Sequence, residues 1–104
     1  MKLIEATMVR IYITENTKIL TPIMHYLEKQ AKIRGLTVFR AIGGFGESGE
    51  QHSAALLDLS LNLPLVVEFF DTTEKVNQVL AYLDPMIKKK HIALWKVKVN
   101  EQSV

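Results

Sequence analysis

The fold is decided by residues 65–87, which read LVVEFFDTTEKVNQVLAYLDPMI. Residues 65–70 are apolar except Glu68, which is typical of a strand that is covered on both faces. The polar residues 71–73 follow at once and offer side-chain oxygens that cap a helix start. A second helix is therefore expected after them, because an apolar stripe recurs at helical spacing. This stripe consists of Val76, Val79, Leu80, Leu83 and Ile87.

The start of the chain repeats this order of a strand followed by a helix. Apolar residues at alternating positions predict a first strand over 8–14, which Leu3 and Ile4 could extend backwards. After a polar connection over 15–20, Thr21 as a cap and Pro22 at the first helical position predict a helix start, and Gly35 its end. The stripe of this helix has the same offsets as the later one: Leu20, Ile23, Met24, Leu27 and Ala31.

Three further segments complete the expected architecture. Strands are predicted over 37–42, 54–61 and 92–99, and the turn at 62–64 predicts that 54–61 forms a hairpin with 65–70. The two β-α-β halves predict an α+β, ferredoxin-like βαββαβ sandwich, in which two helices cover one face of an antiparallel sheet. An additional strand pairing at the C-terminal end is compatible with this arrangement.

Composition limits the classes of protein that fit. The chain has 104 residues, of which 48% are hydrophobic, so we expect one domain over 1–104 with its own core. The absence of cysteine excludes disulfides and thiolate metal sites, and a net charge of +2 does not indicate nucleic acid or membrane as a partner. No apolar run approaches the roughly 20 residues that span a bilayer. The sequence therefore predicts a soluble, cytoplasmic protein without membrane insertion.

The sheet face that the helices leave uncovered is expected to be apolar. Met8 and Tyr12 flank Arg10 on the first strand, and only Glu68 interrupts the apolar side chains of the strand over 65–70. Such a surface is normally covered by another subunit, although these residues could also thicken the edge of the core. We therefore predict a homo-oligomer.

A glycine-rich segment at 43–49 follows the strand over 37–42. The spacing from Gly44 to Gly49 matches G-x-G-x-x-G, but a dinucleotide fingerprint requires a helix after it, and a strand is expected here. Gly43, Gly44 and Gly46 would allow successive backbone N–H groups to point into one concavity that binds an anion or a phosphate. A hairpin connection without a ligand is the alternative, since Glu47 and Glu50 would repel phosphate.

Cations near this segment are further candidates for a ligand site. Arg40 lies just before the glycines and could face a phosphate or a carboxylate across a subunit interface, or simply water. The lysines at 88–90 either complement the negative end of the second helix or bind an anion. His52 adjoins the glycine segment, and the spacing of the three histidines matches no zinc site. No arrangement of nucleophile and base indicates catalysis.

The pattern resembles the PII signalling superfamily, and within it the branch called domain of unknown function 190. The resemblance is carried by Val38-Phe39-Arg40-Ala41-Ile42-Gly43-Gly44-Phe45-Gly46, His52-Ser53-Ala54, Leu63-Pro64-Leu65-Val66-Val67-Glu68 and Leu83-Asp84-Pro85-Met86-Ile87. It covers about residues 8–99. The resemblance implies a non-enzymatic regulatory protein without a bound cofactor.

The resemblance also implies how such a protein works. It implies a homotrimer that binds adenine nucleotides in clefts between subunits through the base of a loop called the T-loop. The candidate ligand residues are Arg40, Gly43, Gly44, Phe45, Gly46, His52, Lys88, Lys89 and Lys90. The loop itself, about 46–53, would dock on a target protein, for which a membrane ion transporter is one candidate. Its candidate contact residues are Glu47, Ser48, Gly49, Glu50 and Gln51.

Three other classes of function are compatible with the fold order. An acylphosphatase-like enzyme would need an arginine in a phosphate-binding loop after the first strand, where only Lys18 provides a cation. RNA binding through the sheet would need aromatic side chains on the strand over 54–61, which has none. A metal-tolerance role like that of another PII-like branch is disfavoured by the absence of cysteine. We therefore predict a regulatory protein with no metal and no nucleic-acid partner.

Overall fold

The computed structural model describes residues 1–14, 18–45, 51–53, 63–87 and 91–104. Its sheet strands are β1 (Leu3–Thr14), β2 (Leu36–Arg40), β5 (Pro64–Asp71) and β6 (Ile92–Asn100). Two short strands are β3 (Gly43–Phe45) and β4 (Gln51–Ser53). The helical segments are α1 (Leu20–His25), the π-helix η2 (Tyr26–Gln30), α2 (Thr73–Leu83) and the 3-10 helices η3 (Asp84–Met86) and η5 (Glu101–Ser103).

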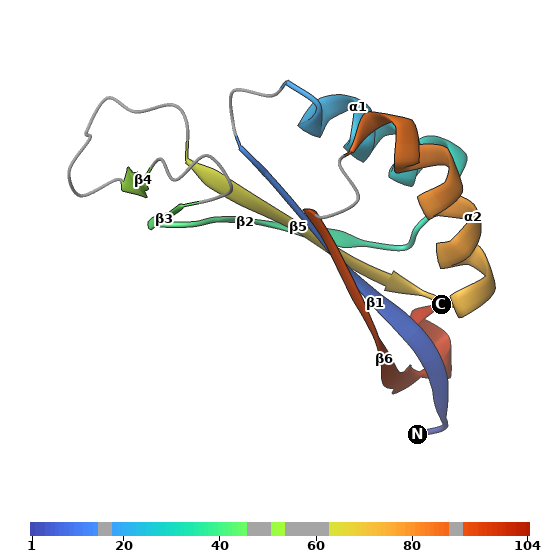
Figure 1. Cartoon of the computed structure of the whole chain (residues 1–104). Coiled ribbons are helices and arrows are strands. Elements are labelled where there is room, and N and C mark those ends of the chain that lie inside the picture. Colours follow the sequence, from blue (N-terminus) through green and yellow to red (C-terminus); the bar gives the residue numbers. More distant parts are fainter. Residues whose placement is uncertain (15–17, 46–50, 54–62, 88–90) are drawn as a thin grey trace.

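The four long strands form one antiparallel sheet in the order β2-β5-β1-β6, and α1 and α2 cover one of its faces (Figure 1). This arrangement confirms the α+β, ferredoxin-like fold. The central strand β1 pairs with β5 from Thr7↔Asp71 to Thr14↔Pro64. It also pairs with β6 from Leu3↔Asn100 to Ile11↔Ile92, so its first residues and the end of β6 form a two-stranded arm beyond β5.

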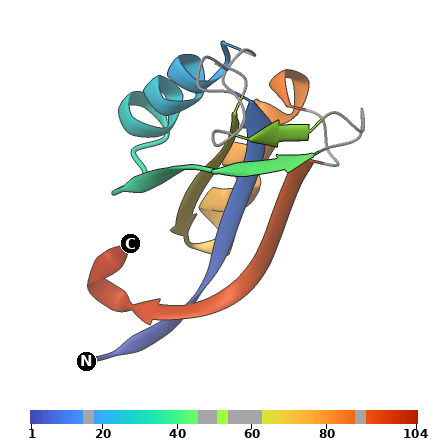
Figure 2. The ribbon, with the colours of Figure 1, turned by 90° about the vertical axis from the view of Figure 1, so that its left-hand side faces the viewer.

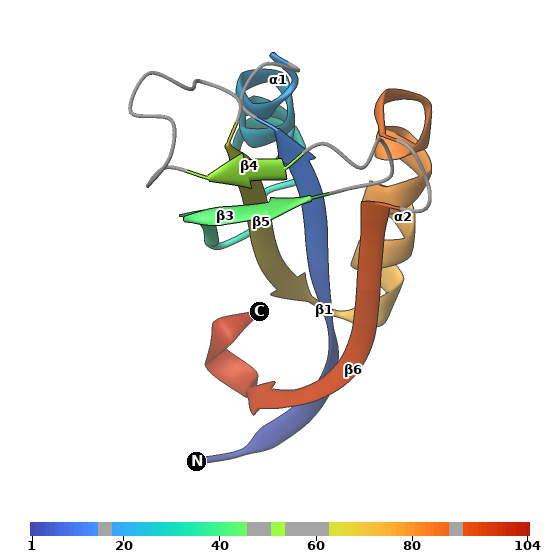
Figure 3. The ribbon, with the colours of Figure 1, turned by 60° about the vertical axis from the view of Figure 1, so that its left-hand side comes forward.

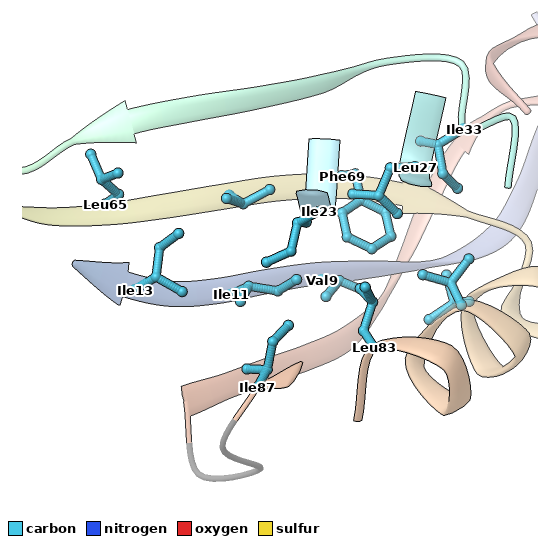
Figure 4. Packing of buried hydrophobic residues seen from close by; sticks show 13 residues of the cluster. Val9, Ile11, Ile13, Ile23, Leu27, Ile33, Leu65, Phe69, Leu83 and Ile87 are labelled. Carbon is cyan, nitrogen blue, oxygen red and sulfur yellow. The ribbon is translucent and has the colours of Figure 1, made fainter. Parts of the chain in front are cut away.

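The core lies between the sheet and the two helices. Odd-numbered residues over 7–13 of β1 and over 65–71 of β5, such as Ile11 and Phe69, point to the helices and are almost completely buried (Figure 4). The helices contribute Ile23, Leu27 and Leu83, each without exposed surface. Burying such side chains removes a large apolar area from water, at about 25 cal/mol per Å². The period-two and helical patterns of the sequence thus converge on one cluster.

The first helix differs from the expectation at both ends. It begins at Leu20 with Ile19 as its N-cap, and Thr21 and Pro22 lie inside its first turn. Proline is tolerated there because the first four N–H groups of a helix have no partner within it. The helix ends in the wide turn of η2 and not at Gly35, because Lys32 adopts a left-handed backbone with φ 59°. This early turn brings Ile33 into the core, where it is 7% exposed.

The second helix begins as expected. Thr72 is its N-cap, and the hydroxyl of Thr72 accepts a hydrogen bond from the backbone N–H of Lys75 at 3.3 Å. The Asp71 carboxylate accepts the N–H of Thr72 at 2.7 Å, so the preceding side chain fixes the entry of the helix as well. These oxygens satisfy donors that the helix itself leaves unpaired.

The bounds of the described strands agree well with the predicted ranges, but one predicted strand pairing differs from the observed one. The first strand starts at Leu3, as the apolar residues before Met8 indicated, and the strand expected over 54–61 lies outside the described residues. The expected hairpin between 54–61 and 65–70 is wrong for residues 65–69, because both edges of β5 are occupied there by β1 and β2. β2 therefore occupies the edge of β5 at which the strand over 54–61 was expected to pair.

The C-terminal end closes over the sheet by a 3-10 turn and not by another strand. The N–H of Glu101 donates to the carbonyl of Lys2 at 2.8 Å, which extends the contact between the two ends of the chain (Figure 2). From there η5 reaches the start of β2, where the Arg34 guanidinium donates to the carbonyls of Gln102 and Val104.

Truncating a core residue of the first helical segment should destabilise the fold strongly. Leu27→Ala removes a completely buried side chain and leaves a cavity, so the free energy of unfolding should fall by about 2–5 kcal/mol. Met24→Ala is the matched control, since Met24 is 38% exposed and should cost under about 1 kcal/mol. Urea denaturation of both variants measures the difference, and equal losses would contradict the assigned core.

Alkaline pH should weaken the contact between the helices. The rings of Tyr26 and Tyr82 are stacked with centroids 3.8 Å apart, and burial raises the pKa of Tyr26 above its ordinary value, with Tyr82 adding to the shift. Because the folded pKa is the higher one, the stabilisation is complete below about pH 10 and is lost as the pH rises through the folded pKa. Tyr26→Phe should remove this part of the loss in urea denaturation at pH 8 and pH 11. An unchanged pH dependence would contradict the assignment.

Candidate functional site

The candidate site gathers at the end of the sheet that lies opposite the two chain termini (Figures 1 and 3). The registers bring the end of β1 beside Pro64, the start of β5, while Arg40 pairs with Leu65. The N–H of Ala41 donates to the carbonyl of Pro64 at 2.9 Å and prolongs this pairing by one residue. The glycine segment therefore leaves the sheet from a fixed position.

The first glycines, in β3, form a small antiparallel pair with β4 outside the main sheet. In the register of β3 and β4, Gly43 faces Ser53, Gly44 faces His52 and Phe45 faces Gln51. A Cβ atom on Gly44 would lie 3.6 Å from Cγ of Pro64, so this backbone runs in close contact with the start of β5. The structure thus brings His52 opposite the glycines that the sequence singled out.

Arg40 lies on the helix side of the sheet at this end. It is exposed, and it lines an open groove together with Val38, Leu65 and Leu20 at the start of α1. Since Val38 and Leu65 also face the helices, the groove combines an apolar floor with one guanidinium group. Such a groove suits a ligand with an apolar ring and an anionic group.

Some candidate residues fall outside the described part of the chain. These are Gly46, Glu47, Ser48, Gly49, Glu50, Lys88, Lys89 and Lys90. The residues that flank the three lysines are described: Ile87 is buried in the core, and Ile92 pairs with Ile11 near the end of β1. Both flanks therefore belong to the same half of the sheet as Arg40.

The sheet face without helices, here called the open face, carries mostly apolar side chains. The registers align them in rows across the strands, and we define an aromatic row of Tyr12, Val66 and Phe39, a polar row of Ala93, Arg10, Glu68 and Thr37, and a lower apolar row of Trp95, Met8 and Phe70. Tyr12, Phe39 and Trp95 are 43%, 48% and 42% exposed, respectively. Large half-exposed aromatics in one continuous surface are typical of an interface.

An ion pair crosses the middle of the open face. Nε of Arg10 donates to Oε2 of Glu68 at 2.7 Å, and the guanidinium carbon of Arg10 lies 5.5 Å from the centroid of the Trp95 ring. The hydrogen bond to Glu68 raises the pKa of Arg10, with a smaller contribution from Tyr12. Sequence reasoning noted both charges but did not pair them, although alternation places each on the open face of its strand.

Two negative findings apply to the described residues. Within them, no group of three histidine, aspartate or glutamate side chains is arranged to hold a metal ion. In the same part of the chain, no helix has the length and hydropathy that crossing a bilayer requires.

Sequence comparison places the chain in a family. Residues 6–99 match DUF190, a family described as "Uncharacterized ACR". The chain belongs to the DUF190 family. This DUF190 protein is 38% identical over 98 residues to a UPF0166 protein of Aquifex aeolicus, with 90% of each chain covered. It is also 34% identical to a UPF0166 protein of Methanocaldococcus jannaschii, with 83% of this chain and 82% of the relative covered.

Solved structures show the same fold at low sequence identity. CPII from Thiomonas intermedia K12, a nitrogen regulatory PII-like protein bound to ADP, AMP and bicarbonate, superposes with a TM-score of 0.76. The match covers 97% of the DUF190 protein and 93% of CPII at 16% identity. The divalent ion tolerance protein CutA1 from Ehrlichia chaffeensis gives a TM-score of 0.60 at 13% identity, with 93% and 86% covered. The resemblance to the PII-like superfamily is thereby confirmed at the level of the fold.

Proposed function

We propose that this chain is a cytoplasmic, non-enzymatic PII-like regulatory protein. It assembles as a homotrimer through the open face, binds a small anionic metabolite in clefts between subunits and controls a target protein through the loop at 46–53. An adenine nucleotide is the first candidate for the metabolite. The proposal rests mainly on one observation, the half-exposed aromatic side chains of the open face.

The open face supports association of several copies. The helices cover only the other face, so Tyr12, Phe39 and Trp95 keep a large apolar area in water while the chain is alone. Covering this area releases about 25 cal/mol per Å², and identical chains usually cover such a patch by assembling with closed symmetry. The resemblance to the PII superfamily implies three as the number of copies.

The end of the sheet that bears the glycines supports a ligand site between copies. Arg40 and the groove beside it lie next to β3, and the flanks of residues 88–90 lie at the same end. An edge strand and a groove at the rim of the sheet form a shared cleft when a second copy packs beside them. CPII, which has this fold, is bound to ADP and AMP, and a nucleotide offers both a ring for the groove and phosphates for the cations.

The loop at 46–53 supports the contact with a target. Its two stems, β3 and β4, pair with each other and form a two-stranded sheet separate from the four-stranded one. A loop on such a stem changes its position without disturbing the core, and ligand at the stem would couple to it. A membrane transporter is one candidate for the target.

Replacing Arg40 should weaken nucleotide binding. Isothermal titration of the wild type with ADP, ATP and AMP should give saturable binding of at least one nucleotide, and Arg40→Ala should reduce the affinity about tenfold or more, as expected for loss of a charged contact. Lys98→Ala is the control, because Lys98 is an exposed cation at the far end of the sheet and should leave binding unchanged. Equal affinity in the wild type and Arg40→Ala would contradict the placement of the site.

A charge on the open face should disperse the oligomer. Phe39→Asp places a carboxylate in the aromatic row, where it would be buried by a neighbouring copy at a cost of several kcal/mol. Sedimentation velocity should therefore show a shift from trimer to monomer. Met24→Asp, which puts the same charge on the exposed side of α1, should sediment like the wild type. A trimer that tolerates Phe39→Asp would contradict assembly through this face.

A further inference from the structure

The polar row is the one interruption of apolar character in the middle of the open face among the described residues. It lies between the aromatic row and the lower apolar row, so a surface that covers the face must also cover Arg10 and Glu68. Their side chains are 43% and 21% exposed. Burying an ion pair under an apolar surface is unfavourable unless further hydrogen bonds are formed. The covering surface must therefore carry complementary polar groups.

Arg10 is held in a defined position on this face. Glu68 accepts its Nε proton, and the guanidinium carbon of Arg10 lies over the Trp95 ring, 5.5 Å from the ring centroid, so two contacts hold the side chain on this face. The opposite residue on β6 is Ala93, which is too small to cover the guanidinium. A guanidinium has five N–H donors, more than one carboxylate oxygen can accept.

Glu68 can be reached from outside. It lines an open groove of about 400 Å³ at the side of the face near η5, together with Thr37, Met8 and Phe70. Arg34 also lines this groove, but its guanidinium is bonded to the carbonyls of Gln102 and Val104. The groove thus presents a carboxylate to an incoming cationic side chain, on a lining that mixes apolar residues such as Met8 and Phe70 with polar ones such as Thr37.

We propose that the Arg10–Glu68 pair sets the register in which copies of this chain dock, with the Arg10 guanidinium of one copy donating to the Glu68 carboxylate of the next. This rests on the assembly through the open face proposed above. Because both charges lie on the same face, the surface is complementary to itself in a ring of identical chains. A shifted register would bury each charge against an apolar row, so the pair selects one arrangement.

Two charge reversals distinguish a contact between copies from one within a chain. Arg10→Glu and Glu68→Arg each produce like charges, both within the chain and towards an identical copy. Each variant alone should assemble more than about tenfold more weakly than the wild type. When the two variants are mixed, the carboxylate introduced at position 10 of one meets the guanidinium introduced at position 68 of the other only across the interface. In a mixed trimer two of the three contacts join opposite charges and one joins like charges, so native mass spectrometry of the mixture should show mixed trimers that are more abundant than the pure trimers of either variant.

Controls keep this test decisive. The double variant Arg10→Glu with Glu68→Arg should assemble like the wild type, while Lys29→Glu, a reversal on an exposed cation of η2, should change nothing. Circular dichroism confirms that each single variant is folded. If the single variants assemble as tightly as the wild type, or if folded single variants fail to form mixed oligomers, the inference is overturned. A monomeric wild type would instead overturn the proposed assembly itself.

Discussion

The constraint on which the structure depends is that the sheet has two apolar faces and the chain has helices for only one of them. Side chains on the helix side, such as Val9 and Phe69, are buried beneath α1 and α2, and this contact supplies the core. Side chains on the open face, such as Tyr12 on β1 and Trp95 on β6, stay half in water. The same alternation that stabilises the single chain therefore leaves an apolar surface uncovered, and this surface is the basis of the proposed assembly.

The candidate site follows from this arrangement by geometry. The glycine segment leaves β2 at Arg40 and is fixed to the start of β5 by the bond from Ala41 to Pro64. It then forms the stem of a loop at the rim of the sheet, where a neighbouring copy would come closest. A ligand in such a cleft would contact one copy through the groove at Arg40 and would change the position of the loop through its stem. Assembly thus precedes sensing in this account.

Local sequence patterns predict most helices and strands of the described residues, but they do not predict which strands pair over long distances in the sequence. The alternation from Val9 to Ile13 and the oxygens at 71–73 act over a few residues, so the sequence displays them directly. The left-handed turn at Lys32 does not follow from its residue type, since lysine has no preference for that conformation, and the need to bury Ile33 decides it. Likewise, the sequence offers both the strand over 37–42 and the strand over 54–61 as neighbours of β5, and the choice of β2 is a long-range pairing that local patterns do not contain. The spacing of its glycines distinguishes the glycine segment in the sequence, whereas the pairing of Gly44 with His52 depends on the register.

The covered state of the open face can be measured directly, because Trp95 is the only tryptophan in the chain and lies on that face. Acrylamide quenching of its fluorescence in the wild type, over a dilution series with parallel light scattering, reports whether a neighbouring copy shields it. The account predicts a shielded, blue-shifted Trp95 at high concentration that becomes accessible as the mass falls towards 11.8 kDa. A Trp95 that is equally accessible at every concentration, with a mass of one chain, would contradict it.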